Sequence, residues 1–308
     1  MKLTMSNRKV YEELCRLIGN DFVLAQEQMK DHTTFRIGGP ADVFVIPQKK
    51  EDVASVLNYC KSREVPYFIM GNGSNLLVSD KGFRGVIVQI FKNMQECSVC
   101  GEIITAQAGI LLSNLAAQAK DSSLTGLEFA SGIPGTLGGA VTMNAGAYGG
   151  EMKNVLRKVN VMDRDGNITE MDAEDLRLGY RTSLIKEKDW IVLSAELKLK
   201  KGDRKAIEET MQGLKEKRVS KQPLQYPSAG STFKRPEGYF AGKLIQDAGL
   251  RGKKIGGAQV SEKHCGFVIN AGGATAEDVR LLMKYVQDTV WDQFQVRLEP
   301  EVKFLGEF

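Results

Sequence analysis

The feature that most constrains this chain is a glycine-dense stretch near its middle, SGIPGTLGGAVTMNAGAYGG, which runs from Ser131 to Gly150. Seven of its twenty residues are glycine and none is charged. Each glycine costs the folding chain conformational entropy, because glycine loses more backbone freedom than any other residue. We therefore expect something to lie against this backbone that side chains would exclude.

A second glycine cluster, GNGSNLLVSD from Gly71 to Asp80, directly follows the apolar run Tyr67–Met70. Glycine lets a backbone approach a ligand closely and present N–H groups in a concave nest that suits phosphate. The third glycine of the dinucleotide fingerprint is missing, because Leu76 takes its place, and the absence of GxxxxGK argues against a P-loop nucleotide hydrolase. At this point a nucleotide cradle and plain tight turns with close sheet packing both remain open.

The charge balance is nearly even, with 42 Lys and Arg against 38 Asp and Glu in 308 residues. A net charge of +4 without a basic tail does not predict a nucleic-acid partner. Val10, Leu14 and Ile18 recur at helical spacing between charged residues, which predicts an amphipathic helix and not a signal peptide. No run is apolar enough to span a bilayer, so no membrane partner and a cytoplasmic location are expected.

The five cysteines are scattered and odd in number, which does not predict a disulfide framework. Cys97 and Cys100 form one CxxC, but a zinc site requires a second pair of ligands. None is present, and His32 and His264 are the only histidines of the sequence. No metal site is predicted.

Hydrophobic periodicity predicts helices and strands in mixed order, with a βαβ unit, a hairpin through Asp165-Gly166 and a boundary near Val219–Pro227. This mixture predicts an α+β fold with more than one small sheet. The helices are expected at Glu51–Lys61, Leu112–Lys120, Asp203–Arg218, Phe240–Ala248 and Thr275–Gln293, and the strands at Val43–Ile46, Pro66–Met70, Gly85–Ile90, Ile103–Ala108, Val155–Met162, Asn167–Met171, Trp190–Leu199 and Gln295–Leu305.

Six motifs in order carry a resemblance to a known family. They are HTTFRIGGPA (His32–Ala41), GNGSNLLVSD (Gly71–Asp80), SGIPGTLGGAVTMNAGAYG (Ser131–Gly149), GYRTS (Gly179–Ser183), PSAGSTFKRP (Pro227–Pro236) and LEPEVKFLG (Leu298–Gly306). Together they resemble the UDP-N-acetylenolpyruvoylglucosamine reductases over nearly the whole chain. The lack of a sizeable insertion between Tyr239 and Ile269 resembles the shorter subtype of that family.

The resemblance implies an α+β architecture of the vanillyl-alcohol-oxidase type. Two α/β subdomains would bind FAD, and a C-terminal α/β domain would bind the substrate. The expected divisions are 1–82 joined by 300–308, then 83–218, then 219–299.

The resemblance also implies the reaction. The family reduces UDP-N-acetylglucosamine enolpyruvate to UDP-N-acetylmuramate in peptidoglycan precursor synthesis, with NADPH as co-substrate and FAD as cofactor. Hydride passes from the flavin N5 to the vinyl carbon, and a serine supplies the proton. The partner expected is therefore a small molecule, and the sequence sets no oligomeric state.

Three residues match the family's catalytic positions. Arg181 in GYRTS would place a fixed cation beside the substrate carboxylate, where hydride addition pushes further negative charge. Ser231 in AGSTF matches the proton donor, and Glu301 matches a residue that positions or polarises the reacting carboxylate. From the pattern alone these would be a surface arginine, a turn serine and part of a solvated strand face, with Glu299 the neighbour most easily confused with Glu301.

The expected ligand contacts fall in the two glycine clusters and at four scattered positions. The cofactor set is Gly71, Asn72, Gly73, Ser74, Asn75, Leu76, Ser131, Gly132, Ile133, Gly135, Thr136, Gly138, Gly139, Asn144 and Gly146. The substrate set is Lys221, chosen from the basic run KEKRVSK, with Arg235, Gln259 and Tyr148. His264 is expected to be structural.

Two other functions are weighed against this one. A flavin oxidase of the same fold would hand electrons to oxygen and lack the Arg, Ser and Glu set. A non-catalytic nucleotide-binding protein would keep the glycine loops without turnover.

Overall fold

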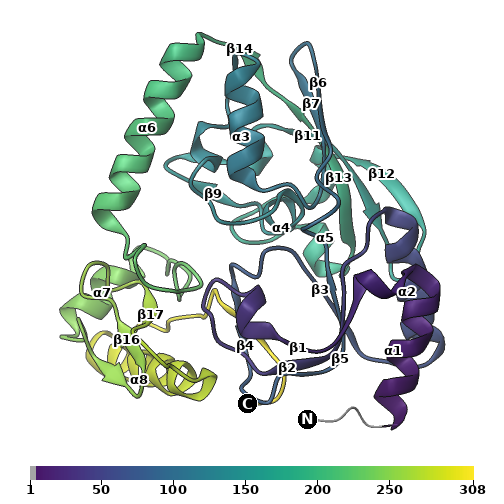
Figure 1. Cartoon of the computed structure of the whole chain (residues 1–308). Coiled ribbons are helices and arrows are strands. Elements are labelled where there is room, and N and C mark those ends of the chain that lie inside the picture. Colours follow the sequence, from purple (N-terminus) through teal and green to yellow (C-terminus); the bar gives the residue numbers. More distant parts are fainter. Residues whose placement is uncertain (1–4) are drawn as a thin grey trace. The chain divides into compact units, whose positions relative to one another are not determined.

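The structure is a computed structural model that describes residues 5–308, and the chain packs as two compact units (Figure 1). Unit 1 comprises Met1–Ala25, Val43–Asn72 and Gly85–Arg218, and unit 2 comprises Gln26–Asp42, Gly73–Arg84 and Val219–Phe308. The first four residues of the expected division 1–82 lie outside the described range. That division into three parts stays a prediction.

The larger sheet of unit 1 has five antiparallel strands in the order β12-β11-β13-β7-β6. Its hairpin turns through Asp163–Gly166, where the Asp163 N–H donates to the Asn167 carbonyl at 3.0 Å, so the Asp165-Gly166 turn prediction is confirmed. The strands are β6 (Cys97–Cys100), β7 (Ile103–Gln107), β11 (Leu156–Met162), β12 (Ile168–Asp172) and β13 (Ile191–Lys198).

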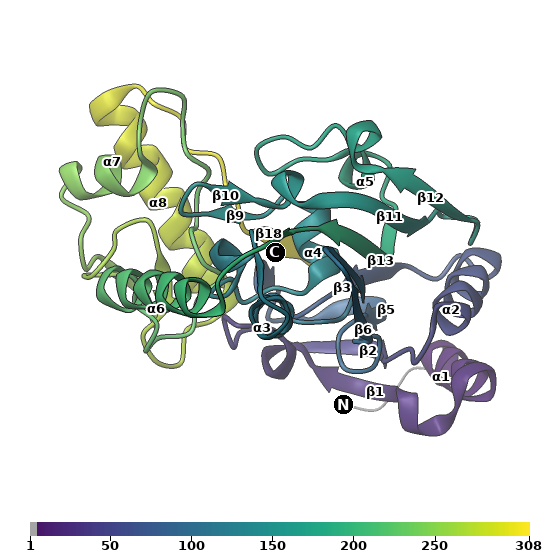
Figure 2. The ribbon, with the colours of Figure 1, turned by 90° about the horizontal axis from the view of Figure 1, so that it is seen from above.

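A four-stranded sheet has the order β1-β2-β5-β3, and its β3 and β5 are parallel, as a βαβ unit requires. Helices α1 (Met5–Ile18) and α2 (Lys50–Ser62) lie side by side (Figure 2) and contribute Leu14 and Val56 to one apolar cluster. The strands are β1 (Val23–Gln28), β2 (Pro40–Val45), β3 (Tyr67–Met70) and β5 (Phe83–Gln89).

The main core of unit 1 lies between the five-stranded sheet and two helices. Alternate side chains of β11 and β13, such as Val159 and Ala195, are buried there. Leu115 of α3 (Leu112–Asp121) and Val141 of α4 (Leu137–Thr142) pack against them. The short elements of this unit are β8 (Leu124–Thr125), β9 (Gly146–Ala147), β10 (Gly150–Glu151), α5 (Leu184–Glu187) and β14 (Lys200–Lys201).

Unit 2 builds its own core around α8 (Ala276–Phe294), which begins with the predicted capping box of Thr275 and Asp278. Asp80 also accepts the Ala276 N–H, at 2.8 Å. The other elements are β4 (Leu76–Val78), α7 (Ala241–Asp247), β15 (Lys254–Ile255), β16 (Ala258–Val260), β17 (Val268–Asn270) and β18 (Lys303–Leu305). Strand β18 pairs with β4 in parallel.

Two secondary-structure predictions are corrected by the structure. The expected strand Gln295–Leu305 is wrong over most of its length, because only Lys303–Leu305 is a strand and Gln295 takes a left-handed conformation that ends α8. Helix α6 (Arg204–Lys221) runs three residues past the expected end at Arg218. Helical spacing predicts Ile207, Met211 and Leu214 on its buried face, but of these three only Ile207 is buried. None of the helices within residues 5–308 is long and apolar enough to cross a membrane.

Helix α6 offers a direct test of local packing at Gly213. A Cβ built on Gly213 meets nothing within 4 Å, so Gly213→Ala should stabilise the protein by about 0.5–1 kcal/mol, because Ala restricts the unfolded chain and favours the helix. Urea unfolding of the purified protein measures the change.

The matched contrast is Gly82→Ala. Here φ is +79° and an added Cβ would lie 1.8 Å from the Pro40 carbonyl oxygen, so this variant should lose more than about 1 kcal/mol. Equal stability of the two variants would contradict the packing described.

Candidate active site

Gly71 and Asn72, at the start of the first glycine cluster, meet the second cluster within unit 1. A Cβ on Gly71 would lie 2.3 Å from the Thr136 hydroxyl oxygen, so only glycine permits this approach. One residue later, the Asn72 side-chain amide donates to the Pro134 carbonyl at 2.7 Å. The backbone that follows β3 is thereby held against the backbone that precedes α4.

The first cluster presents a run of unused backbone donors. Within residues 5–308, no group accepts a hydrogen bond from the main-chain N–H of Asn72, Gly73, Ser74 or Asn75. Gly73 is buried and has φ +62°, a conformation that glycine adopts without strain. Buried backbone N–H groups are almost always paired, so a run of unsatisfied ones fits an anionic ligand such as a diphosphate.

The second cluster divides into residues that serve the fold and residues that stay open. The Gly138 N–H donates to the Ala108 carbonyl at 2.8 Å, and a Cβ on Gly146 would lie 2.7 Å from the Gly150 oxygen. Gly132 and Gly139 are exposed, and no described residue accepts the N–H of Gly132. The open glycines of the cluster are therefore Gly132 and Gly139.

The predicted polar side chains of this cluster all have protein partners. The Ser131 hydroxyl donates to the Glu128 carbonyl at 2.8 Å, and the Thr136 hydroxyl accepts from the Gly139 N–H at 3.4 Å as the N-cap of α4. These two hydroxyls shape the turn. They are consistent with a cofactor held mainly by backbone, and Ile133 adds an apolar contact to the core below.

Asn144 is the most connected residue of the cluster. It is only 1% exposed, and its side-chain amide donates to the Glu151 carboxylate at 2.7 Å and to the Gly179 carbonyl at 3.2 Å. Its side-chain oxygen accepts the Lys153 N–H at 2.9 Å. The amide therefore has little capacity left for a ligand, and its role in the structure is to join the glycine-dense stretch to the segment that carries Arg181.

The GYRTS segment has a second anchor to the same stretch. The Ser183 hydroxyl donates to the Thr142 carbonyl at 2.7 Å, and Gly179 pairs with Thr182 in a tight bridge. Between these anchors Arg181 has φ +57°, which is unfavourable for a residue with a Cβ, and its guanidinium lies 5.1 Å from the centre of the Tyr180 ring. The segment thus holds Arg181 in a strained and defined position within unit 1.

Ser231 and Glu301 come from neighbouring segments of unit 2. The Glu301 N–H donates to the carbonyl of Thr232 at 2.9 Å, and Phe233 pairs with Pro300. Ser231 is exposed beside Gly230, whose φ is +76°. The structure therefore brings two of the three predicted catalytic residues to adjacent backbone positions.

The structure also separates Glu301 from the neighbour most easily confused with it. Lys234 donates to the Glu299 carboxylate at 2.7 Å and holds the pKa of that carboxyl below its usual range. Glu299 is therefore committed to an ion pair at the surface. The alternation in this segment predicts a strand with one apolar and one charged face; that strand does not form before Lys303, although Leu298 and Val302 of the apolar face are buried.

The four predicted substrate residues lie in different surroundings. Tyr148 is 47% exposed and Lys221 is exposed at the end of α6. The Arg235 guanidinium lies 4.0 Å from the centre of the Phe240 ring. Gln259 is buried, and its amide donates to the Gly252 carbonyl at 3.3 Å, so its side chain serves the fold of unit 2.

His264 has the surroundings of a structural residue. Burial lowers the pKa of its imidazole, which is therefore neutral near pH 7, and Nδ1 accepts the Gly266 N–H at 3.1 Å. Its ring packs edge-on against Phe267, with centroids 5.1 Å apart.

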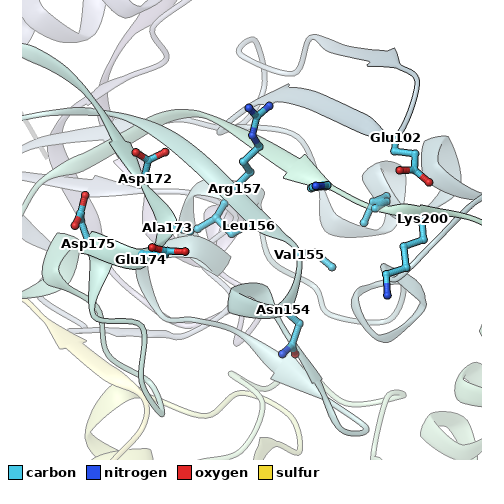
Figure 3. Close-up of a pocket in the computed structure, with 12 residues that line it drawn as sticks. Glu102, Asn154, Val155, Leu156, Arg157, Asp172, Ala173, Glu174, Asp175 and Lys200 are labelled. Atoms are coloured by element: carbon cyan, nitrogen blue, oxygen red, sulfur yellow. The ribbon is translucent and has the colours of Figure 1, made fainter.

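Unit 1 has a surface pocket of about 600 Å³ (Figure 3). Acidic and basic side chains line it, among them Asp172, Glu174 and Arg157. It includes none of the predicted site residues. Among residues 5–308, no group of three His, Cys, Asp or Glu side chains is placed to hold a metal ion.

The role of Asn144 as a brace, which joins the glycine-dense stretch to the segment that carries Arg181, can be tested by substitution. Asn144→Ala would leave the Gly179 carbonyl and the Lys153 N–H without their partner, which should cost about 1–3 kcal/mol of stability. The exposed Asn58 of α2 is the control, because Asn58→Ala removes an amide of the same size. Thermal unfolding compares the two, and an unchanged midpoint for Asn144→Ala would contradict a bracing role.

Comparison with known proteins assigns two regions to described domains. Residues 41–172 match the FAD binding domain, and residues 222–305 match the C-terminal domain of UDP-N-acetylenolpyruvoylglucosamine reductase. The chain is 52% identical over 303 residues to the UDP-N-acetylenolpyruvoylglucosamine reductase of Alkaliphilus oremlandii, covering 98% of this chain and 100% of that protein. The protein of the same name from Clostridioides difficile is 49% identical over the same shares.

Solved structures give the same result for the fold. The UDP-N-acetylenolpyruvylglucosamine reductase of Thermus caldophilus is similar with a TM-score of 0.80 and 35% identity, over 92% of this chain and 100% of that one. The 4-ethylphenol oxidase of Gulosibacter chungangensis has a TM-score of 0.52 and 13% identity, over 97% of this chain and 66% of that one, which supports the fold alone. The predicted α+β fold of the vanillyl-alcohol-oxidase type is confirmed.

Proposed function

The chain belongs to the UDP-N-acetylenolpyruvoylglucosamine reductase family, and we propose that Arg181, Ser231 and Glu301 divide the chemistry of its reaction. The enzyme is an FAD-dependent oxidoreductase that uses NADPH to reduce UDP-N-acetylglucosamine enolpyruvate in peptidoglycan precursor synthesis. Family membership disfavours both the oxidase and the non-catalytic alternative. The roles of Arg181, Ser231 and Glu301 are the proposal.

We assign the FAD diphosphate to the unused N–H groups of Asn72 to Asn75. Within unit 1, Gly71 and the exposed Gly132 and Gly139 supply uncharged backbone. Bound FAD supplies a hydride acceptor and donor between NADPH and the enolpyruvyl double bond. The protein's part in this step is to bind and orient the ring without placing a competing charge against it.

Arg181 binds and neutralises the substrate carboxylate in this proposal. The observation that carries it is the double anchor of its segment, through Asn144 to Gly179 and through Ser183 to Thr142. Hydride addition drives further charge toward a carboxylate that is already negative. A guanidinium keeps its charge at every physiological pH, and a group fixed in advance costs no reorganisation during the reaction.

Ser231 holds the proton for the carbon next to the one that would accept the hydride, and Glu301 orients the reacting carboxylate or its neighbours. Ser231 and Glu301 lie on two backbone segments that the Thr232–Glu301 hydrogen bond joins, so the same backbone arrangement positions both residues. This supports assigning them to the same step. A serine hydroxyl is a weak acid, but the carbon that forms after hydride addition is a stronger base. Placement of the O–H then matters more than its acidity.

Substrate binding is assigned to the exposed cations and to Tyr148. Lys221 and Arg235 are proposed to contact the nucleotide part of the substrate, while Gln259 acts through the fold of unit 2. We also propose the three-part division 1–82 with 300–308, 83–218 and 219–299 as the functional one. A cytoplasmic location is proposed because NADPH is available there.

Ser231→Ala tests the assignment by splitting the reaction into halves. Bleaching of the bound flavin by NADPH should proceed at the normal rate, whereas reoxidation by the enolpyruvyl substrate should slow by at least about a hundredfold. Anaerobic stopped-flow absorbance measures both steps. Ser55→Ala, which removes an exposed hydroxyl from α2, is the control.

Equal slowing of both halves in Ser231→Ala would show that Ser231 is not the specific proton donor. A wild-type protein that binds FAD but is not bleached by NADPH would instead contradict the reaction itself.

A further inference from the structure

Arg218 lies against the open backbone of the glycine-dense stretch. It is the last residue of unit 1, on helix α6, and a Cβ built on Gly132 would lie 3.1 Å from both its Cδ and its Nη1. The side chain therefore crosses the space that a side chain at position 132 would fill. Glycine at position 132 is what admits the guanidinium beside the loop.

This cation has no acidic partner. Among residues 5–308, no carboxylate lies within ion-pair distance of Arg218, whereas Arg204 on the same helix pairs with Asp121 at 2.9 Å. Arg218 is partly buried, and this burial lowers the pKa of its guanidinium. Desolvating a cation without an opposite charge costs free energy, which an anionic ligand would recover.

The groups around Arg218 suit a phosphate. The N–H of the exposed Gly132 donates to no described residue. The Tyr148 side chain lies close enough to interact electrostatically with the Arg218 guanidinium. An arginine offers two parallel N–H donors to one phosphate, and a backbone N–H beside it adds a third. Lys221, one turn later on α6, is exposed and offers only a point charge.

We propose that Arg218 is a ligand-binding residue that contacts a phosphate of a nucleoside diphosphate lying over Gly132. This inference rests on the function proposed above, which supplies two ligands of this chemistry, FAD and the UDP-sugar. Arg218 thereby extends the site beyond the residues that match the family's catalytic motifs. Its positive charge balances the diphosphate where the glycine backbone carries none.

The test compares Arg218→Met, which removes the charge, with Arg218→Lys, which keeps it and loses the paired donors. Lys205→Met is the control, because Lys205 lies on the same helix and its side chain is 85% exposed. Fluorescence titration of the apoprotein gives the FAD dissociation constant. Calorimetric titration of the oxidised holoenzyme with UDP-N-acetylglucosamine gives the affinity for a UDP-sugar.

Arg218→Met should weaken one of these two ligands by about tenfold or more, with Arg218→Lys between it and the wild type and Lys205→Met unchanged. The ligand that weakens identifies which diphosphate Arg218 contacts. Affinities equal to those of Lys205→Met for both ligands would overturn the proposal. If Arg218→Met does not fold by circular dichroism, Arg218→Lys alone decides, and wild-type affinity for both ligands overturns it.

Failure here is distinguishable from failure of the proposed function. Arg218 variants report on binding, whereas the split between flavin bleaching and reoxidation reports on Ser231. If the wild-type enzyme completes both half-reactions but Arg218→Met binds both ligands normally, the proposed role of Arg218 is wrong and the proposed reaction stands.

Discussion

The close approach of the Gly71 backbone to the Thr136 side chain is the constraint on which the site in unit 1 depends. An added Cβ at Gly71 would lie 2.3 Å from the Thr136 oxygen, so the contact exists only because one partner has no side chain. Within unit 1 this contact places Gly71 and Asn72 beside Pro134 and Thr136 of the second cluster. In the proposed function, the entropy that both clusters cost in folding is offset where their backbone binds a ligand.

The Asn144 amide and the Ser183 hydroxyl connect the glycine-dense stretch to the segment that carries Arg181. Asn144 is buried with three hydrogen bonds that reach Glu151, Lys153 and Gly179, and it holds the chain in an unfavourable conformation with φ +42°. A buried amide whose donors and acceptor are all paired costs little, whereas one missing partner is expensive. Such a brace is therefore stable only in one geometry, which is what a positioned Arg181 requires.

The sequence predicted most elements because their hydrophobic periods are regular, as in α2, β11 and α8, and because Thr275 and Asp278 form a recognisable cap. It failed over Gln295–Val302, where alternation suggested a strand but Gln295 turned left-handed and pairing was limited to the bridge at Pro300. Alternation reports which residues are buried and does not report whether a partner strand exists. Leu298 and Val302 are accordingly buried without a sheet.

For the site, motifs predicted residues but could not predict which of their side chains the protein itself uses. Asn144 and Gln259 were expected to meet ligands, yet both amides are used within the protein, and their partners lie far away in the sequence or depend on a fold that spacing does not reveal. The sequence favoured Lys221 and not Arg218 as the phosphate contact, because the positions of a basic run cannot be told apart by pattern. What distinguishes Arg218 is its contact with Gly132 and its lack of a carboxylate partner within the described residues, and both properties exist only after folding.

The distribution of charge follows from the chemistry of hydride transfer. A cofactor that alternates between oxidised and reduced states is held most evenly by backbone dipoles, because a fixed cation beside its ring would favour one state. The substrate differs, since its carboxylate is negative before the reaction and gains further charge during it. In the proposed function, the uncharged glycine backbone and the strained, anchored Arg181 therefore meet different electrostatic needs of one reaction, and the Asn144 amide joins the two segments that carry them.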